Sequence, residues 1–158
     1  MSLRIPKPLK EEHHELHMAL AAALDVPGPV GAAARAVARK LHPHFVKEEE
    51  YALPPLGLLA DLAAGRRVTG GTATKARAMT ARLKRDLPEM LAEHRAIVRK
   101  LNALAAAAKS AKKPEYARLA AKIVLHAQTE EEVLYPAAIL VGKMLHIAKS
   151  ETRNSKPD

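Results

Sequence analysis

The sequence of 158 residues predicts an all-α protein, an up-down four-helix bundle made of two pseudo-repeated helical hairpins. The composition is typical of helices, because alanine, leucine and charged residues dominate and only 3% of the residues are aromatic. Apolar residues recur every three or four positions along four long stretches. The pattern H-x-x-x-E-E-E-x-x-x-P also occurs twice, starting at His44 and at His126. Such a repeat predicts two similar hairpins that pack around one core.

The first hairpin is expected to extend to residue 64. Its first helix should run from Pro8 to Leu24, followed by a turn over 25–29 that holds two prolines and a glycine. The second helix should begin near Val30. Prolines at 43, 54 and 55 predict kinks in this helix, because proline removes one backbone hydrogen bond and its ring clashes with the carbonyl four residues earlier.

The second hairpin follows the one long break in the helical pattern, from Gly65 to Thr74, which contains three glycines. A helical stretch then reaches Ala111, and Pro88 should kink or restart it. The last helix should begin at Pro114, which suits the first position of a helix, and run to about Ala148.

We expect residues 1–150 to form one bundle domain and residues 151–158 to be a polar C-terminal tail. Because the chain has no cysteine, both disulfides and thiolate metal sites are excluded. The N-terminus is charged and has no long apolar run, and no stretch reaches 18 apolar residues, so we expect a cytoplasmic protein that does not enter the membrane.

The formal net charge is +9, which raises the question of a nucleic-acid partner. Lysine and arginine cluster between Arg66 and Lys100 and again from Lys109 to Lys113. No recognition helix, zinc finger or aromatic RNA-binding signature accompanies them. We therefore interpret the charge as solvated helix faces, and a nucleic-acid partner is not expected.

Four histidines and two glutamates fall on the predicted inward faces of the four helices. Residues four apart lie on the same side of a helix, so each motif presents a histidine together with a glutamate. The proposed metal ligands are His13, His44, Glu48, His94, His126 and Glu130. A buried cluster of this kind would leave several polar groups unpaired without a cation. The remaining motif glutamates, Glu49, Glu50, Glu131 and Glu132, are interpreted as solvated charge.

Two other metal motifs do not fit the sequence. The zinc peptidase motif H-E-x-x-H fails, because the glutamate in His13-His14-Glu15-Leu16-His17 stands one position too late. The ferritin-like Glu-x-x-His motif occurs only once, as Glu11 and His14, whereas a di-iron site of that type needs two copies.

At these residues the chain resembles the hemerythrin family, specifically the HHE cation-binding domains, from about Leu9 to Leu140. The resemblance rests on Glu12-His13, on Glu93-His94 and on the two repeated motifs, the second of which continues through Leu134-Tyr135-Pro136. It implies two iron ions in a four-helix bundle, bridged by two carboxylates and an oxo or hydroxo group. It also implies reversible binding of dioxygen, or sensing of oxygen, iron or nitric oxide.

One feature departs from the oxygen carriers of that family, which have a second histidine one turn away on the third helix. Met90 and Val98 stand at those positions here. Four imidazoles, two bridging carboxylates and a bridging oxygen then fill ten of the twelve positions of two octahedral ions. His17, four residues after His13, either fills one of the two open positions or is a plain core or rim histidine.

The resulting functional hypothesis is a non-haem di-iron protein for oxygen or nitric oxide binding, sensing or redox chemistry. The alternative is an iron-responsive regulatory or metal-storage module with a basic partner-binding face. Nitrogen and oxygen donors suit iron, manganese or zinc, and iron follows from the resemblance alone. An enzyme is the least favoured reading, because no substrate pocket is evident from the sequence, and the oligomeric state is left open.

Overall fold

The computed structural model describes residues 3–154, and for residues 149–154 it describes the backbone alone. Six α-helices occur in this range, interrupted by short π and 3-10 segments. The α-helices are α1 (Lys7–Leu24), α2 (Pro29–Lys47), α3 (Leu59–Ala63), α4 (Gly70–Ser110), α5 (Pro114–Thr129) and α6 (Tyr135–Asn154). The predicted tail therefore begins as helix, and its residues 155–158 lie outside the described part of the chain.

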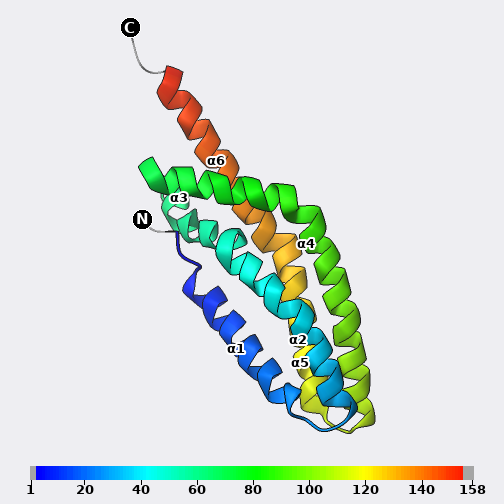
Figure 1. Ribbon diagram of the computed structural model, residues 1–158. Coiled ribbons are helices and arrows are strands. Elements are labelled where there is room, and N and C mark those ends of the chain that lie inside the picture. Colours follow the sequence, from blue (N-terminus) through cyan, green and yellow to red (C-terminus); the bar gives the residue numbers. More distant parts are fainter. Residues whose placement is uncertain (1–2, 155–158) are drawn as a thin grey trace.

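Four helices form the bundle that the sequence predicts. Helix α1 packs against α2, α2 against α4, α4 against α5, and α5 back against α1, so the four close into a ring (Figure 1). The turn between α1 and α2 depends on Gly28, whose φ of 78° is strained for any residue with a side chain. The all-α, four-helix architecture is confirmed.

Each repeated motif ends its α-helix in a π turn, over Glu48–Ala52 (η1) and Glu130–Leu134 (η3). The backbone N–H of Leu53 donates to the carbonyl of Glu48 at 2.9 Å, and that of Tyr135 donates to the carbonyl of Glu130. A proline follows each of these donors, and the wider turn moves the carbonyl with which its ring would clash. The kink predicted near Pro54 is thus a π turn that begins at Glu48, whereas α2 continues as an α-helix through Pro43. The matching π turn that begins at Glu130 was not predicted.

The π turn at η3 shifts the helical phase of everything after it. The apolar spacing of the sequence predicts Val133 on the inward face of the last helix, but it is 55% exposed, whereas Tyr135 and Ala138 are buried. A continuous α-helix, with about 100° per residue, would have kept Val133 in line with His126 and Glu130. The sequence also predicts Leu125 among the apolar side chains that surround the histidines, but 63% of its surface is exposed.

Helix α4 is one continuous helix through Pro88, although it bends on its way along the bundle (Figure 1). Its first part lies across the end of the bundle and packs on α6. The contact is close, since a Cβ at Gly142 would lie 2.2 Å from Oγ1 of Thr80. The predicted break is also shorter than expected, because α4 already begins at Gly70.

Two apolar clusters fill the bundle on either side of the histidine level. The cluster nearer the hairpin turns contains Leu16, Leu20, Leu41, Phe45, Ile97 and Leu101. The cluster on the other side contains Tyr51, Leu53, Leu56, Leu83, Met90 and Tyr135. Among the described residues, no helix is both long and apolar enough to cross a membrane.

Candidate metal centre

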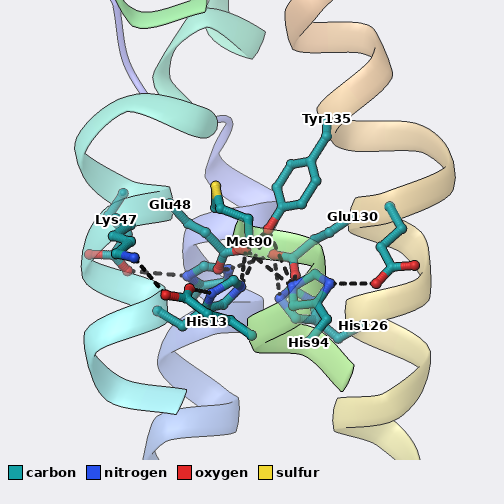
Figure 2. Close-up of polar contacts among 12 residues, drawn as sticks. His13, Lys47, Glu48, Met90, His94, His126, Glu130 and Tyr135 are labelled. Carbon is teal, nitrogen blue, oxygen red and sulfur yellow. Dashed lines mark hydrogen bonds and ion pairs between the residues drawn. The ribbon is translucent and has the colours of Figure 1, made fainter. Parts of the chain in front are cut away.

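The six proposed ligands meet at one level of the bundle, each from a different segment. His13 comes from α1, His44 from α2 and His94 from α4. His126 comes from α5, while Glu48 and Glu130 are the first residues of the two π turns. All six side chains are buried, because each lies on the apolar stripe of its segment. Figure 2 shows the two carboxylates entering the centre from opposite sides.

The six proposed ligands divide into two groups that share both glutamates. One group is His13, His126, Glu48 and Glu130, and the other is His44, His94, Glu48 and Glu130. Within each group, one ligand atom from every residue lies within 4.8 Å of the others. Each pair of histidines combines one residue from each hairpin, which the sequence alone did not predict.

Each glutamate turns one oxygen to each group. Glu48 places Oε1 3.1 Å from Nε2 of His44 and Oε2 3.7 Å from Nε2 of His13. Glu130 places Oε1 2.9 Å from Nε2 of His126 and Oε2 3.4 Å from Nε2 of His94. Both carboxylates are therefore arranged to bridge two ions.

Four glutamates form an outer layer around the centre, and each lies near Nδ1 of one of its four histidines. Nδ1 of His44 lies 2.6 Å from Glu93, and Nδ1 of His94 lies 2.8 Å from Glu131. The corresponding distances are 3.3 Å for the pair His13–Glu49 and 3.4 Å for the pair His126–Glu12. Carboxylates in this position hold a metal-binding imidazole in one orientation and make it more basic.

This outer layer corrects part of the sequence interpretation. Glu49 and Glu131 are not simply solvated charge, since each contacts a buried histidine. A signal was present, because both follow a bridging glutamate directly in the two copies of the motif. Glu50 instead pairs with Arg82 on the surface, and Glu132 is exposed.

Lys47 ties one outer glutamate in place. Its Nζ donates to Glu93 at 2.6 Å and to Glu89 at 2.7 Å. Hydrogen bonds to these two glutamates raise the pKa of Lys47. Burial works against ionisation of Glu93, but hydrogen bonds from His44 and Lys47 outweigh it and lower the pKa of that carboxyl.

The electrostatics of the metal-free centre favour protons on the imidazoles. Burial disfavours the charged form of His94, but contacts with Glu130 and Glu48 outweigh burial and raise its pKa to about 10. The pKa values of His13, His44 and His126 are raised by the same balance. Contacts with three histidines outweigh the burial of Glu130 and lower its pKa. Positive charge at this level is thus strongly favoured, and a bound cation would replace the protons.

The unpaired polar atoms test whether a cation fits. Five buried side-chain atoms among the described residues have no hydrogen-bond partner, and all belong to the centre. They are Nε2 of His13, Oε2 of Glu48, Nδ1 and Nε2 of His126, and Oε1 of Glu130. Four of the five are the inward donor atoms of the first group, so a cation there would satisfy what the protein alone leaves unpaired.

Comparison with known families decides what kind of centre this is. A family model described as "Hemerythrin HHE cation binding domain" matches residues 5–138, which include all six proposed ligands. The chain belongs to this family. No curated protein and no solved structure gives a significant match to this HHE domain.

His17 stands apart from the centre of this HHE domain. Its ring packs edge-on against Phe45 and His42, with centroids 4.9 and 5.6 Å away. It is in neither of the two ligand groups. Burial and the neighbouring His42 lower the pKa of His17. The structure thus brings the six proposed ligands together and leaves His17, the one further candidate, outside both groups.

Tyr135 enters the centre of the HHE domain from the start of α6, directly after the second π turn. Its hydroxyl donates to Oε1 of Glu48 in a short hydrogen bond and lies 3.4 Å from Nε2 of His44 and 3.3 Å from Nε2 of His94 (Figure 2). Burial, together with the nearby carboxylates, raises the pKa of this phenol. Sequence reasoning placed Tyr135 near the motif but did not predict this contact, because it depends on the π turn.

Proposed function

We propose that this protein is a non-haem di-iron protein that binds a small gas, dioxygen or nitric oxide, for sensing or redox chemistry. The observation that carries the proposal is the pair of buried histidine groups that share Glu48 and Glu130. Two carboxylates that each turn one oxygen to either group suit a pair of ions held close together. Iron, with a bridging oxo or hydroxo group, is the part of the proposal that comes from the family resemblance.

The donor set fits iron chemically. Neutral imidazole nitrogens and carboxylate oxygens, with no thiolate in the sequence, are ligands for borderline and hard divalent metals. The four outer glutamates would offset the positive charge that two ions bring into the bundle. When bound, two iron ions would supply the redox electrons and the open coordination that a small gas requires.

The surroundings of the centre suit a small neutral molecule. The ring of Phe45 stacks on His13 with centroids 4.1 Å apart, and apolar clusters cover both sides of the histidine level. An apolar environment admits a neutral gas and excludes water, which protects a reactive centre from unwanted proton transfer. The same environment strengthens the interaction of the buried carboxylates with the ions.

Metal reconstitution followed by optical spectroscopy tests this function. Protein loaded with iron(II) without oxygen should approach two ions per chain by elemental analysis. Exposure to oxygen or nitric oxide should then change its visible charge-transfer spectrum. Saturation near one ion, with no weaker second site, would refute the dinuclear arrangement, and an unchanged spectrum with two ions bound would refute gas binding.

A regulatory or storage module with a basic partner-binding face is the second candidate. A groove of about 960 Å³ between α4 and α5 is bordered by Lys109, Lys112, Lys113 and Arg118 over an apolar floor. Such a rim favours an acidic protein partner, because opposite charge steers association. Two bound irons that leave the spectrum unchanged under oxygen and nitric oxide would favour this candidate over the first.

A further inference from the structure

The hydroxyl of Tyr135 occupies a position that a metal donor would take. The side chain is 1% exposed, and its oxygen meets three inward donor atoms, from Glu48, His44 and His94. Two donors that are neighbours on an octahedral ion, with bonds of about 2.1 Å, lie about 3.0 Å apart. The distances of 3.3 and 3.4 Å from Tyr135 to the two imidazoles are close to that spacing.

A hydroxyl has a single hydrogen, so Tyr135 could not satisfy these three atoms once all of them are acceptors. Metal binding requires neutral imidazoles, whose Nδ1 hydrogens would then face Glu93 and Glu131. The Nε2 lone pairs of His44 and His94 and an oxygen of Glu48 would all face Tyr135, which has one hydrogen to donate. A cation between these atoms resolves the conflict, with the phenol oxygen as one more donor.

The second π turn puts Tyr135 in this position. Residues five apart in an α-helix point about 140° apart. In a π turn, the hydrogen bond between residues i and i+5 closes about one turn over these five residues, so their side chains point in nearly the same direction. Tyr135 therefore follows Glu130 onto the inward face, five residues later. In the first hairpin, 82 residues earlier, the same place after Glu48 is taken by Leu53, which is fully buried and offers no donor.

The two halves of the centre therefore differ. The inward donor atoms of the His13 and His126 group have no hydrogen-bond partner, while three of the four inward donor atoms of the other group meet the phenol. The outer carboxylates follow the same division, being closer to His44 and His94 than to His13 and His126.

We propose that Tyr135 is a fifth protein donor to the ion held by His44 and His94, so that an external ligand binds at the ion held by His13 and His126. The inference rests on the di-iron function proposed above. When iron(III) binds, the phenol O–H bond breaks, its proton passes to solvent, and the oxygen bonds to the metal as a phenolate. The donor count then rises to eleven of twelve, which leaves one open position instead of two.

Substitution of the tyrosine tests the assignment on purified, iron-loaded protein after oxidation in air. The wild type should show a phenolate-to-iron(III) charge-transfer band with tyrosinate vibrations in its resonance Raman spectrum. Tyr135→Phe should lose both while keeping the fold by circular dichroism and two irons per chain. Tyr51→Phe is the matched control, because Tyr51 is also buried near the centre but its hydroxyl meets Met90 instead. That variant should keep the phenolate band.

Titration with azide, a small external ligand for iron(III), counts the open positions. The wild type should bind one azide per iron pair, and Tyr135→Phe should bind two. A wild type without tyrosinate vibrations, or one that binds two azides, would overturn the assignment of Tyr135 while leaving the di-iron function standing. A wild type that holds fewer than two irons would instead remove the proposed function on which the inference rests.

Discussion

Glu93 offers a sharp test of how the outer carboxylates support the metal ligands. Its carboxylate lies 2.6 Å from Nδ1 of His44 and is held by Lys47. Loss of such support costs about 10- to 100-fold in metal affinity. Because this contact is short and charge-assisted, we expect Glu93→Gln to lie at the upper end, about 100-fold or about 2.8 kcal/mol, for the ion bound by His44.

The repeat supplies a matched control at Glu12, which stands one residue before His13 as Glu93 stands before His94. Glu12 lies 3.4 Å from Nδ1 of His126, and that nitrogen has no hydrogen-bond partner. We therefore expect Glu12→Gln to weaken binding by less than about 10-fold. The assay is competition between the protein and a chromophoric chelator for zinc(II), which has no redox chemistry, at fixed pH. Equal losses of zinc affinity in Glu93→Gln and Glu12→Gln would refute the link between metal affinity and the distance from the outer carboxylate to the histidine Nδ1.

Four further perturbations follow from the geometry of the centre. Glu48→Ala and Glu130→Ala should each abolish two-ion binding, since each removes a bridge, and elemental analysis showing two ions in either variant would contradict the bridging role. Chelation should lower the melting temperature by more than about 10 °C, because a metal present at about 1,000 times its Kd adds about 4 kcal/mol per site to the free energy of unfolding. Identical melting curves with and without metal would contradict this coupling. Without metal, the raised pKa of His94 implies stability that is complete below about pH 6.5 and is lost as the pH rises towards about 10, which urea unfolding across that range would measure. His17→Ala should keep both ions and the spectrum, because its ring contacts Phe45 rather than the carboxylates, and a shifted charge-transfer band would contradict that placement.

The fold and the inner ligands were accessible from the sequence because both are periodic. Helical spacing placed His13 and His94 on inward stripes, and the spacing of four residues tied His44 to Glu48 and His126 to Glu130. Each of these inferences uses only residues within about one turn of each other. The same reasoning could not decide which histidines share an ion, because that depends on how two distant hairpins pack.

The features that the sequence did not reveal arise where the helix departs from its regular period. A π turn cannot be read from apolar spacing, and the one at Glu130 moves Val133 outward and Tyr135 inward. The outer glutamates were missed for a related reason. Half-exposed residues such as Glu49 carry no hydrophobic signal, and their role appears only when a facing helix brings a histidine to them.

The differences between the two hairpins matter as much as their similarity. The two repeats are offset by 82 residues, so Lys47 corresponds to Thr129 and Leu53 corresponds to Tyr135. Both of these differences between the repeats affect the same side of the centre. Lys47 fixes the glutamate that holds His44, and Tyr135 lies against His44 and His94. A perfectly symmetric repeat would bind two equivalent ions, neither more exchangeable than the other. Lys47 and Tyr135 instead stabilise the His44 and His94 side of the centre. An external ligand could therefore bind on the His13 and His126 side without displacing either metal ion.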